Sequence, residues 1–230
     1  MIRQATLWLR WRLRARRPVN PVVADSGGVA SRRGVDRCAI TYINLDRRAD
    51  RREAIEGEWA RLGIAHARRL AAVEAADGAA GCAASHLAAL ERWDPDVTDL
   101  LMVCEDDALF LVDRAVLDAI IERFAADPAL DVLCLGFNAA HEVPISATFS
   151  ITADTQTTSC YVLKRWMRAP FVEMARVSVA SFAGGRRGVP IDRAWKALQR
   201  RYCFAIPRIR AVRQRPSFSD VEGRVVDYRM

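Results

Sequence analysis

The sequence lacks the short motifs that mark several common enzyme classes. It contains neither a GxxxxGK[ST] segment nor a GxGxxG segment, so neither a P-loop nor a dinucleotide-binding fold is indicated. No serine lies in a GxSxG segment, which argues against a hydrolase with a serine triad. The three histidines, His66, His86 and His141, do not have the spacing of zinc ligands.

Paired cysteines and long apolar runs are also missing. The six cysteines are scattered singly without a CxxC segment, and most of them lie in apolar surroundings. This pattern favours reduced thiols and a cytoplasmic location over a disulfide framework. No apolar run approaches the ~18–20 residues that a membrane-spanning helix needs, so we expect no transmembrane segment.

Basic charge is confined to one end of the chain. The net charge is +7, and residues 1–34 contain eight arginines but a single acid, Asp25. Residues 35–230 are therefore neutral, which argues against nucleic-acid binding by the folded part, because such a domain carries its positive charge on itself. We expect a basic tail and linker at residues 1–34, a single domain at residues 35–230 and no nucleic-acid partner.

Residues 1–17 interleave tryptophan and leucine with arginine. A helical arrangement places Leu7, Trp8, Trp11 and Ala15 on one side and Arg3, Arg10, Arg14 and Arg17 on another. This combination predicts contact with an anionic membrane surface, which would make the protein peripheral to the inner face of the cytoplasmic membrane. The alternative is a basic extension without regular structure.

Apolar runs and helical patterns alternate along the chain. Strands are expected near 38–45, 67–73, 99–104 and 131–136, with helices near 46–63, 81–93 and 114–126. This alternation predicts an α/β fold with a mostly parallel central sheet, right-handed crossovers and helices on both faces. Later in the chain we expect antiparallel strands at 148–153 and 159–163, helices at 165–175 and 191–201, and little regular structure in 202–230.

The most informative segment is a fully apolar strand followed by three acids. Leu100–Cys104 precedes Glu105, Asp106 and Asp107 without a break. Ligands of open α/β sheets bind beyond the carboxyl ends of the strands, which is where these acids would project. Strand alternation would place Glu105 and Asp107 on one face and turn Asp106 away. Two carboxylates suit Mg²⁺ or Mn²⁺; the alternative is a solvated acidic strand end.

Several segments together resemble glycosyltransferase family 25, which includes lipopolysaccharide and lipooligosaccharide galactosyltransferases. Residues 42–52 (YINLDRRADRR) are similar to the family's first strand and its arginine-rich turn, and residues 81–87 (GCAASHL) to its Gly-Cys…Ser-His-Leu block. Residues 105–107 stand where the family has its Glu-Asp-Asp signature. The weaker similarities are residues 158–163, Pro190-Ile191-Asp192, Gln214 and Ser219.

The resemblance implies a GT-A-type fold and an inverting, metal-assisted transfer of a sugar from a nucleotide sugar. The expected donor is UDP-galactose, the acceptor a cell-surface glycan or lipid-linked saccharide such as lipopolysaccharide, and the cofactor Mn²⁺ or Mg²⁺. Glu105 and Asp107 would bind the metal, and Asp106 would support them or contact the ribose or sugar. Donor binding is assigned to Asn44, Leu45, Arg51, Ser85 and His86.

Inversion requires a base, for which Asp192 is the candidate. Asp192 follows Pro190-Ile191 and opens an expected helix, so the alternative role is a favourable interaction with the helix dipole.

One position departs from the family pattern. The family usually has a glutamate two residues before the Gly-Cys pair, and this chain has Ala79 there. Two alternatives therefore stay open: a catalytically inactive protein of the same fold that binds a sugar nucleotide or a partner, and a metal-dependent phosphohydrolase that uses the acidic strand end.

Overall fold

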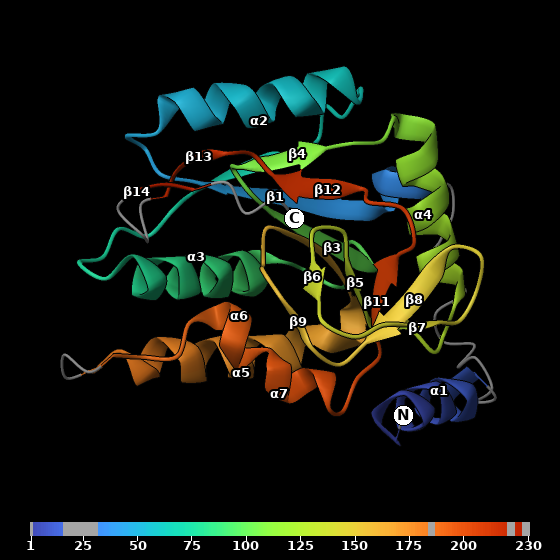
Figure 1. The fold of residues 1–230 in the computed structure, drawn as a ribbon. Coiled ribbons are helices and arrows are strands. Elements are labelled where there is room, and N and C mark those ends of the chain that lie inside the picture. The colour runs from blue at the N-terminus through green and yellow to red at the C-terminus, as the bar shows by residue number, and fades with distance from the viewer. Residues whose placement is uncertain (1, 16–31, 184–186, 220–223, 227–230) are drawn as a thin grey trace.

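An eight-stranded sheet forms the centre of the molecule (Figure 1). The computed structural model describes residues 2–15, 32–183, 187–219 and 224–226. The strands of the central sheet, in spatial order, are β2 (Arg68–Ala71), β1 (Cys38–Asn44), β3 (Leu100–Glu105), β10 (Cys160–Lys164), β5 (Val132–Cys134), β11 (Phe204–Pro207), β8 (Phe149–Thr152) and β7 (Val143–Pro144).

Three two-stranded sheets accompany the central one in the described residues. Each is a pair of short segments, and they are β4 (Ala108–Phe110) with β12 (Val212–Gln214), β6 (Asn138–Ala139) with β9 (Thr155–Gln156), and β13 (Ser217–Ser219) with β14 (Arg224–Val226).

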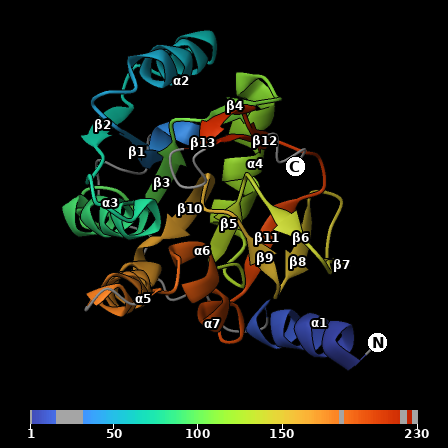
Figure 2. The same cartoon turned by 60° about the vertical axis from the view of Figure 1, so that its left-hand side comes forward.

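Helices cover both faces of the central sheet (Figure 2). The α-helices are α1 (Ile2–Ala15), α2 (Ala49–Arg61), α3 (Gly78–Arg92), α4 (Arg114–Ala126), α5 (Arg168–Ser181), α6 (Ile191–Ala194) and α7 (Lys196–Gln199), and the short 3-10 helices are η2 (Gly34–Arg37) and η3 (Arg165–Met167). Buried side chains of α2 and α4 pack on one face, and those of α3, α5 and α6 pack on the other. The predicted α/β class is confirmed.

The sheet is mixed, and its parallel neighbours β2, β1 and β3 lie where the sequence predicts strands. β2, β1 and β3 are parallel neighbours, and β5 is parallel to β11. β10 runs antiparallel between β3 and β5, and β8 runs antiparallel to β11. These two antiparallel strands correspond to the segments predicted at 159–163 and 148–153. The amino end of β10 therefore meets the carboxyl ends of β1 and β3 at one edge of the sheet.

β3 is buried on both faces, as its apolar sequence predicts. Leu100, Met102 and Cys104 pack into the core beneath α2 and α4. Leu101 and Val103 pack into the opposite core against α3 and α5. A strand enclosed in this way cannot shift its register by one residue without exchanging its two buried faces. The position of the acids that follow it is fixed by this core.

Two expectations for the second half of the chain are wrong. The helix expected at 191–201 is two short helices, α6 and α7, joined at the fully buried Trp195. The segment 202–230, expected to be irregular, contains β11 inside the central sheet. Its apolar run, Cys203–Ile206, is only four residues long and is followed at once by Pro207, so its strand pattern is too short to be distinctive.

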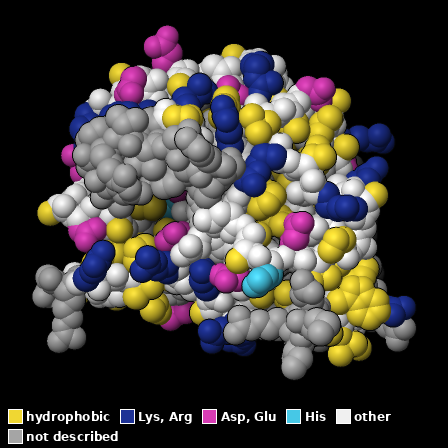
Figure 3. Space-filling model, viewed as in Figure 1, with side chains coloured by type: hydrophobic (Ala, Val, Ile, Leu, Met, Phe, Trp, Pro, Cys, Tyr) yellow, Lys and Arg dark blue, Asp and Glu magenta, His cyan; other side chains and the backbone are white. Residues whose placement is uncertain are grey.

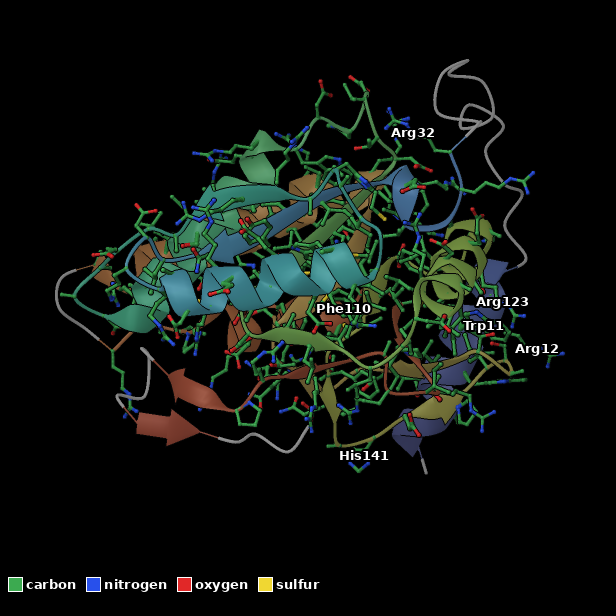
Figure 4. The ribbon with its side chains drawn as sticks, turned by 90° about the horizontal axis from the view of Figure 1, so that it is seen from above. Trp11, Arg12, Arg32, Phe110, Arg123 and His141 are labelled. Atoms are coloured by element: carbon green, nitrogen blue, oxygen red, sulfur yellow. The ribbon has the colours of Figure 1, made fainter. Side chains whose placement is uncertain are left out.

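The basic tail contains a helix that lies on the domain. α1 contacts β7 and β8, with Leu7 buried and Trp11 packed against the core beneath α2 and α4. Figure 4 shows Trp11 and Arg12 on α1 on the side of the molecule where α4 lies. Residues 16–31, which contain most of the expected linker, lie outside the described residues. Among the described helices, none is long and apolar enough to cross a membrane.

Candidate functional site

A cavity of about 920 Å³ opens at the sheet edge where β1, β3 and the amino end of β10 meet. The residues singled out from the sequence all line it, and they are Asn44, Leu45, Arg51, Ser85, His86, Glu105, Asp106, Asp107 and Asp192. They come from four segments that are far apart in the chain. The structure thus brings every predicted site residue to one cavity, and the acids do not form a solvated strand end.

Glu105 is the last residue of β3, and two side chains hold it. Its backbone N–H donates to the carbonyl of Ser159 (2.8 Å), and its Oε1 accepts a hydrogen bond from Thr158 Oγ1 (2.8 Å). Oε1 also lies 3.3 Å from His86 Nε2. Burial by itself would raise the pKa of Glu105, but these hydrogen bonds and the charge of Arg51 lower it below its ordinary value. Glu105 is therefore a carboxylate at neutral pH.

Asp106 is held by Asn44 at the end of β1 and by Arg51 in the first turn of α2. Its Oδ2 accepts from Asn44 Nδ2 (2.8 Å), and its Oδ1 accepts from Arg51 Nη1 (3.0 Å). The same Arg51 Nη1 is 3.9 Å from Asp107 Oδ2. The expected orientation of Asp106, away from the other two acids, is wrong. β3 ends at Glu105, and the next two residues form a turn in which strand alternation no longer applies.

Asn44 connects this turn to the rest of the sheet edge. Its Nδ2 also donates to the carbonyl of Arg48 (3.0 Å), and its Oδ1 accepts from Arg69 Nε (3.0 Å). Every polar atom of the buried amide is used, so Asn44 fixes the loop after β1 and the position of Asp106 together.

Asp107 is the acid with the most perturbed ionisation. Its Oδ2 accepts from Gln214 Nε2 (3.3 Å), whereas within the described part of the chain its buried Oδ1 has no hydrogen-bond partner. Burial and the neighbouring Glu105 raise the pKa of Asp107 to about 7. Gln214 belongs to β12, which pairs with β4 directly after the acidic turn. A segment near the end of the sequence thus encloses the acids.

The wall formed by α3 depends on a close approach of two backbones. Ser85 Oγ donates to the carbonyl of Gly81 (2.7 Å) and accepts from the N–H of Val73 (2.8 Å), which attaches the segment after β2 to the helix. A Cβ at Gly81 would lie 2.6 Å from the carbonyl oxygen of Val73, so only glycine fits there. The next residue after Ser85, His86, is fully buried, and its Nδ1 lies 3.0 Å from Tyr161 Oη.

The opposite wall comes from the second half of the chain. Asp192 lies in the first turn of α6. Burial, together with the charge of Glu105, raises the pKa of Asp192. Arg187 and Arg193 line the cavity near it, and Arg47 and Arg51 line it from the side of β1. Arg186, which precedes Arg187 in the sequence, lies outside the described residues.

Thr157 and Thr158 are site residues that the sequence does not predict. Thr157 has a φ of 75°, a left-handed conformation that is rare for a β-branched residue. Its Oγ1 donates to Gln214 Oε1 (3.0 Å), so the strained residue links β10 to β12 beside the acids. Backbone strain of this kind concentrates at functional sites. A threonine-rich segment (TQTTS) carries no pattern from which this geometry could be derived.

Comparisons with known proteins identify no family. No protein-family model matches the sequence, and no curated protein matches it. The crystal structure of A197 from STIV aligns with 76% of this chain and 83% of its own, at 13% identity and a TM-score of 0.44. A mannose-1-phosphate geranyltransferase from Thermus thermophilus aligns at 9% identity and a TM-score of 0.38, over 76% of this chain and 58% of that chain. Both similarities are too distant to indicate a function.

The raised pKa of Asp107 predicts how stability depends on pH. Between about pH 4 and pH 7 the folded protein keeps the Asp107 proton while the unfolded chain releases it, since the pKa rises from 3.8 to about 7 on folding. The free energy of unfolding should therefore fall as the pH rises through this range, by about 1.4 kcal/mol per unit of pKa difference at most.

The measurement is urea unfolding of chelator-treated protein below and above this range, for the wild type and for Asp107→Asn. The variant should lose this part of the pH dependence and be the more stable of the two at the higher pH. Parallel pH profiles for the two proteins would contradict the assignment.

Proposed function

We propose that this protein is a glycosyltransferase that moves a sugar, with galactose the expected one, from a UDP-sugar to a cell-surface glycan acceptor. The observation that carries the proposal is the convergence of the family-25-like segments on one cavity. Side chains from the segments 44–51, 85–86 and 105–107, and Asp192, line it, although these segments are widely separated in the sequence. A volume of about 920 Å³ lies in the range of small-molecule sites and at its larger end, as a nucleotide sugar requires.

The charge distribution of the cavity supports an anionic donor beside a carboxylate centre. Among the described residues, the arginines that line the cavity are Arg47, Arg51, Arg187 and Arg193. Guanidinium groups bind phosphate oxygens in pairs, so these residues are suited to a diphosphate. Arg51 already contacts Asp106 and Asp107, which places a positive charge next to the acids. We assign Arg51 to the diphosphate, with Asn44 and Leu45 next to it in the donor site.

Glu105 and Asp107 fit a hard divalent cation, Mn²⁺ or Mg²⁺. Both offer carboxylate oxygens, and the buried Asp107 Oδ1 has no hydrogen-bond partner among the described residues. Two neighbouring carboxylates also repel one another, as the raised pKa of Asp107 reflects. A bound cation would relieve this repulsion and stabilise the negative charge on the departing diphosphate.

Asp192 would act as the base of an inverting transfer. Its carboxylate would accept the proton of the acceptor hydroxyl as that oxygen attacks the anomeric carbon. The bond from the sugar to the diphosphate then breaks, and its electron pair leaves with UDP. The pKa of Asp192 is raised by burial and by Glu105, which makes it a better proton acceptor than an exposed aspartate.

Other predicted residues are assigned supporting roles. Asp106 uses both oxygens to bind Asn44 and Arg51, so we assign it to positioning the acidic turn and Arg51. The Ser85 hydroxyl is engaged by two backbone groups, so it shapes the donor wall. We assign His86 to the wall beside the donor, and its Nε2, 3.3 Å from Oε1, holds Glu105 in position.

A second candidate function is a catalytically inactive protein that binds a sugar nucleotide. The observation that favours it is Ala79, which lies in the first turn of α3 and lines the cavity where the family has a glutamate. Such a protein would bind UDP-sugars through the same arginines and acids but would not turn them over.

Donor binding tests the metal and nucleotide assignments together. Asp107→Ala should abolish Mn²⁺-dependent binding of UDP-galactose in calorimetry, because the cation that neutralises the diphosphate loses a ligand. Glu173→Gln, at an exposed position on α5, is the matched control and should bind as the wild type does. A panel of nucleotide sugars in a thermal-shift assay would identify the sugar. Wild-type affinity of Asp107→Ala would contradict the metal site.

Asp192→Asn separates catalysis from binding. Turnover of the UDP-sugar, measured as UDP release with Mn²⁺, should fall by ~10²–10⁴-fold, since the acceptor proton loses its base. The dissociation constant of the donor should stay close to the wild-type value. A purely helix-stabilising Asp192 would instead lower the melting temperature and leave turnover unchanged. Absence of turnover in the wild type, with donor binding intact, would select the inactive binder.

We also infer that residues 1–17 bind the anionic inner face of the cytoplasmic membrane. α1 turns Leu7 toward the domain and leaves Trp8, Leu9 and Leu13 exposed, with the Arg12 guanidinium 4.5 Å above the Trp8 ring. Figure 3 shows hydrophobic side chains gathered over α1 and the strands beside it. Apolar side chains flanked by arginines suit a headgroup region of negative charge.

Vesicle flotation tests this inference. The double variant Leu9→Ser, Leu13→Ser should float less with anionic vesicles than the wild type, because buried apolar area and arginine attraction act together. The control is Val177→Ser with Ile209→Ser, two residues of comparable exposure elsewhere on the surface. Equal flotation of both double variants, or equal flotation of the wild type with neutral vesicles, would reject the membrane contact.

A further inference from the structure

A cysteine, a histidine and a glutamate meet in the wall of the cavity. Cys82 and His86 lie one turn apart on the same side of α3, and Glu105 ends the adjacent β3. The ligand atoms of the three residues all lie within 4.8 Å of one another. This set differs from the oxygen pair of Glu105 and Asp107, because a thiolate and an imidazole are ligands that softer metals prefer.

The spacing of two of these atoms already matches metal coordination. His86 Nε2 and Glu105 Oε1 are 3.3 Å apart. Two ligands that bind zinc tetrahedrally, with bonds of ~2.0–2.1 Å, are separated by about 3.3 Å. The Cys82 sulfur lies within 4.8 Å of both atoms, whereas a zinc–thiolate bond of ~2.3 Å would place it about 3.6 Å from each. Movement of the Cys82 side chain is therefore the rearrangement that a three-ligand site needs.

Tyr161 fixes the orientation of the His86 ring on the side away from Glu105. The His86 Nδ1 lies 3.0 Å from Tyr161 Oη, and the two rings stack with centroids 5.7 Å apart. Histidines that bind metals commonly donate their second ring N–H to an acceptor such as a carboxylate, a backbone carbonyl or water, and here the Tyr161 hydroxyl oxygen takes that place. In the metal-free protein, Tyr161 can donate to Nδ1 while Nε2–H donates to Glu105. A metal at Nε2 requires the opposite tautomer, in which Nδ1–H donates to Tyr161 Oη. The Tyr161 O–H must then rotate away from Nδ1.

Cys82 is half-buried, and burial together with the charge of Glu105 raises the pKa of its thiol, so a metal must displace the thiol proton to bind the sulfur. Cys82 lines the cavity, whereas the other five cysteines are buried. A metal that enters the cavity therefore reaches Cys82 directly, and the cavity leaves room for a fourth ligand from solvent.

We propose that Cys82, His86 and Glu105 form a binding site for Zn²⁺ or a similar thiophilic divalent metal, with the fourth position open to the cavity. This site goes beyond the proposed transfer reaction. It shares Glu105 with the oxygen site, so occupation by zinc withdraws that carboxylate from the Mn²⁺ or Mg²⁺ pair. Zinc would then oppose donor binding in the same cavity.

Cobalt is the probe for this site, because Co²⁺ in a tetrahedral thiolate site has intense visible bands and a thiolate-to-cobalt charge-transfer band. Chelator-treated full-length protein is titrated with Co²⁺ in the absence of nucleotide. The wild type should show both features, and added Zn²⁺ should remove them. Cys82→Ser should lose the charge-transfer band, whereas the control Cys38→Ala, a buried cysteine at the start of β1, should keep it.

Tyr161→Phe provides a second variant that retains the packed ring. It should weaken Zn²⁺ binding by ~10–100-fold, measured by competition with a chromogenic chelator, because His86 loses the group that orients it.

Absence of the charge-transfer band in the wild type, or its persistence in Cys82→Ser, would overturn the proposal. Neither result depends on UDP-sugar turnover, so failure of the zinc site and failure of the proposed transferase are distinguishable.

Discussion

The architecture of the cavity depends on one buried ion pair, between Arg51 and Asp106. Three consecutive carboxylates at the end of a buried strand would repel one another and open the turn if no positive charge met them. Arg51, from the first turns of α2, meets Asp106 at 3.0 Å and reaches toward Asp107. Asn44 completes the arrangement from β1. Removing one partner of such a pair leaves an uncompensated buried charge, so these residues hold the sheet edge together.

The cavity combines two halves of different construction. The side formed by β1, α2, α3 and β3 belongs to the parallel part of the sheet, where short loops and buried strands fix each side chain. The other side comes from Thr157–Ser159, α6 and β12, which follow antiparallel strands and short helices. Glu105 connects the two sides of the cavity, because its Oε1 contacts His86 from the first side and Thr158 from the second. The three consecutive acids and Arg51 thus come from the first half of the chain, and the second half contributes Asp192 and further arginines to the cavity.

The parallel half of the fold and its site residues could be predicted from sequence, and the antiparallel half only in part. The run Leu100–Cys104 and the acids after it predict a buried strand and a site at its end. The orientation of Asp106 could not be predicted, because it depends on where β3 stops and a turn begins. The sequence does not predict β11, because its run of apolar residues is short and is followed by Pro207. Thr157 acquires its left-handed conformation from tertiary contacts with Gln214, which no local pattern encodes.

The place of β11 in the sheet has a consequence for synthesis. This strand, at Phe204–Pro207, is inserted between β5 and β8 and connects β8 and β7 to the other strands. A ribosome makes the chain from the amino end, so β5 and β8 are both translated some 50 residues or more before β11. Until then, nascent β5 and β8 each present an unpaired edge, which is the kind of surface that chaperones cover.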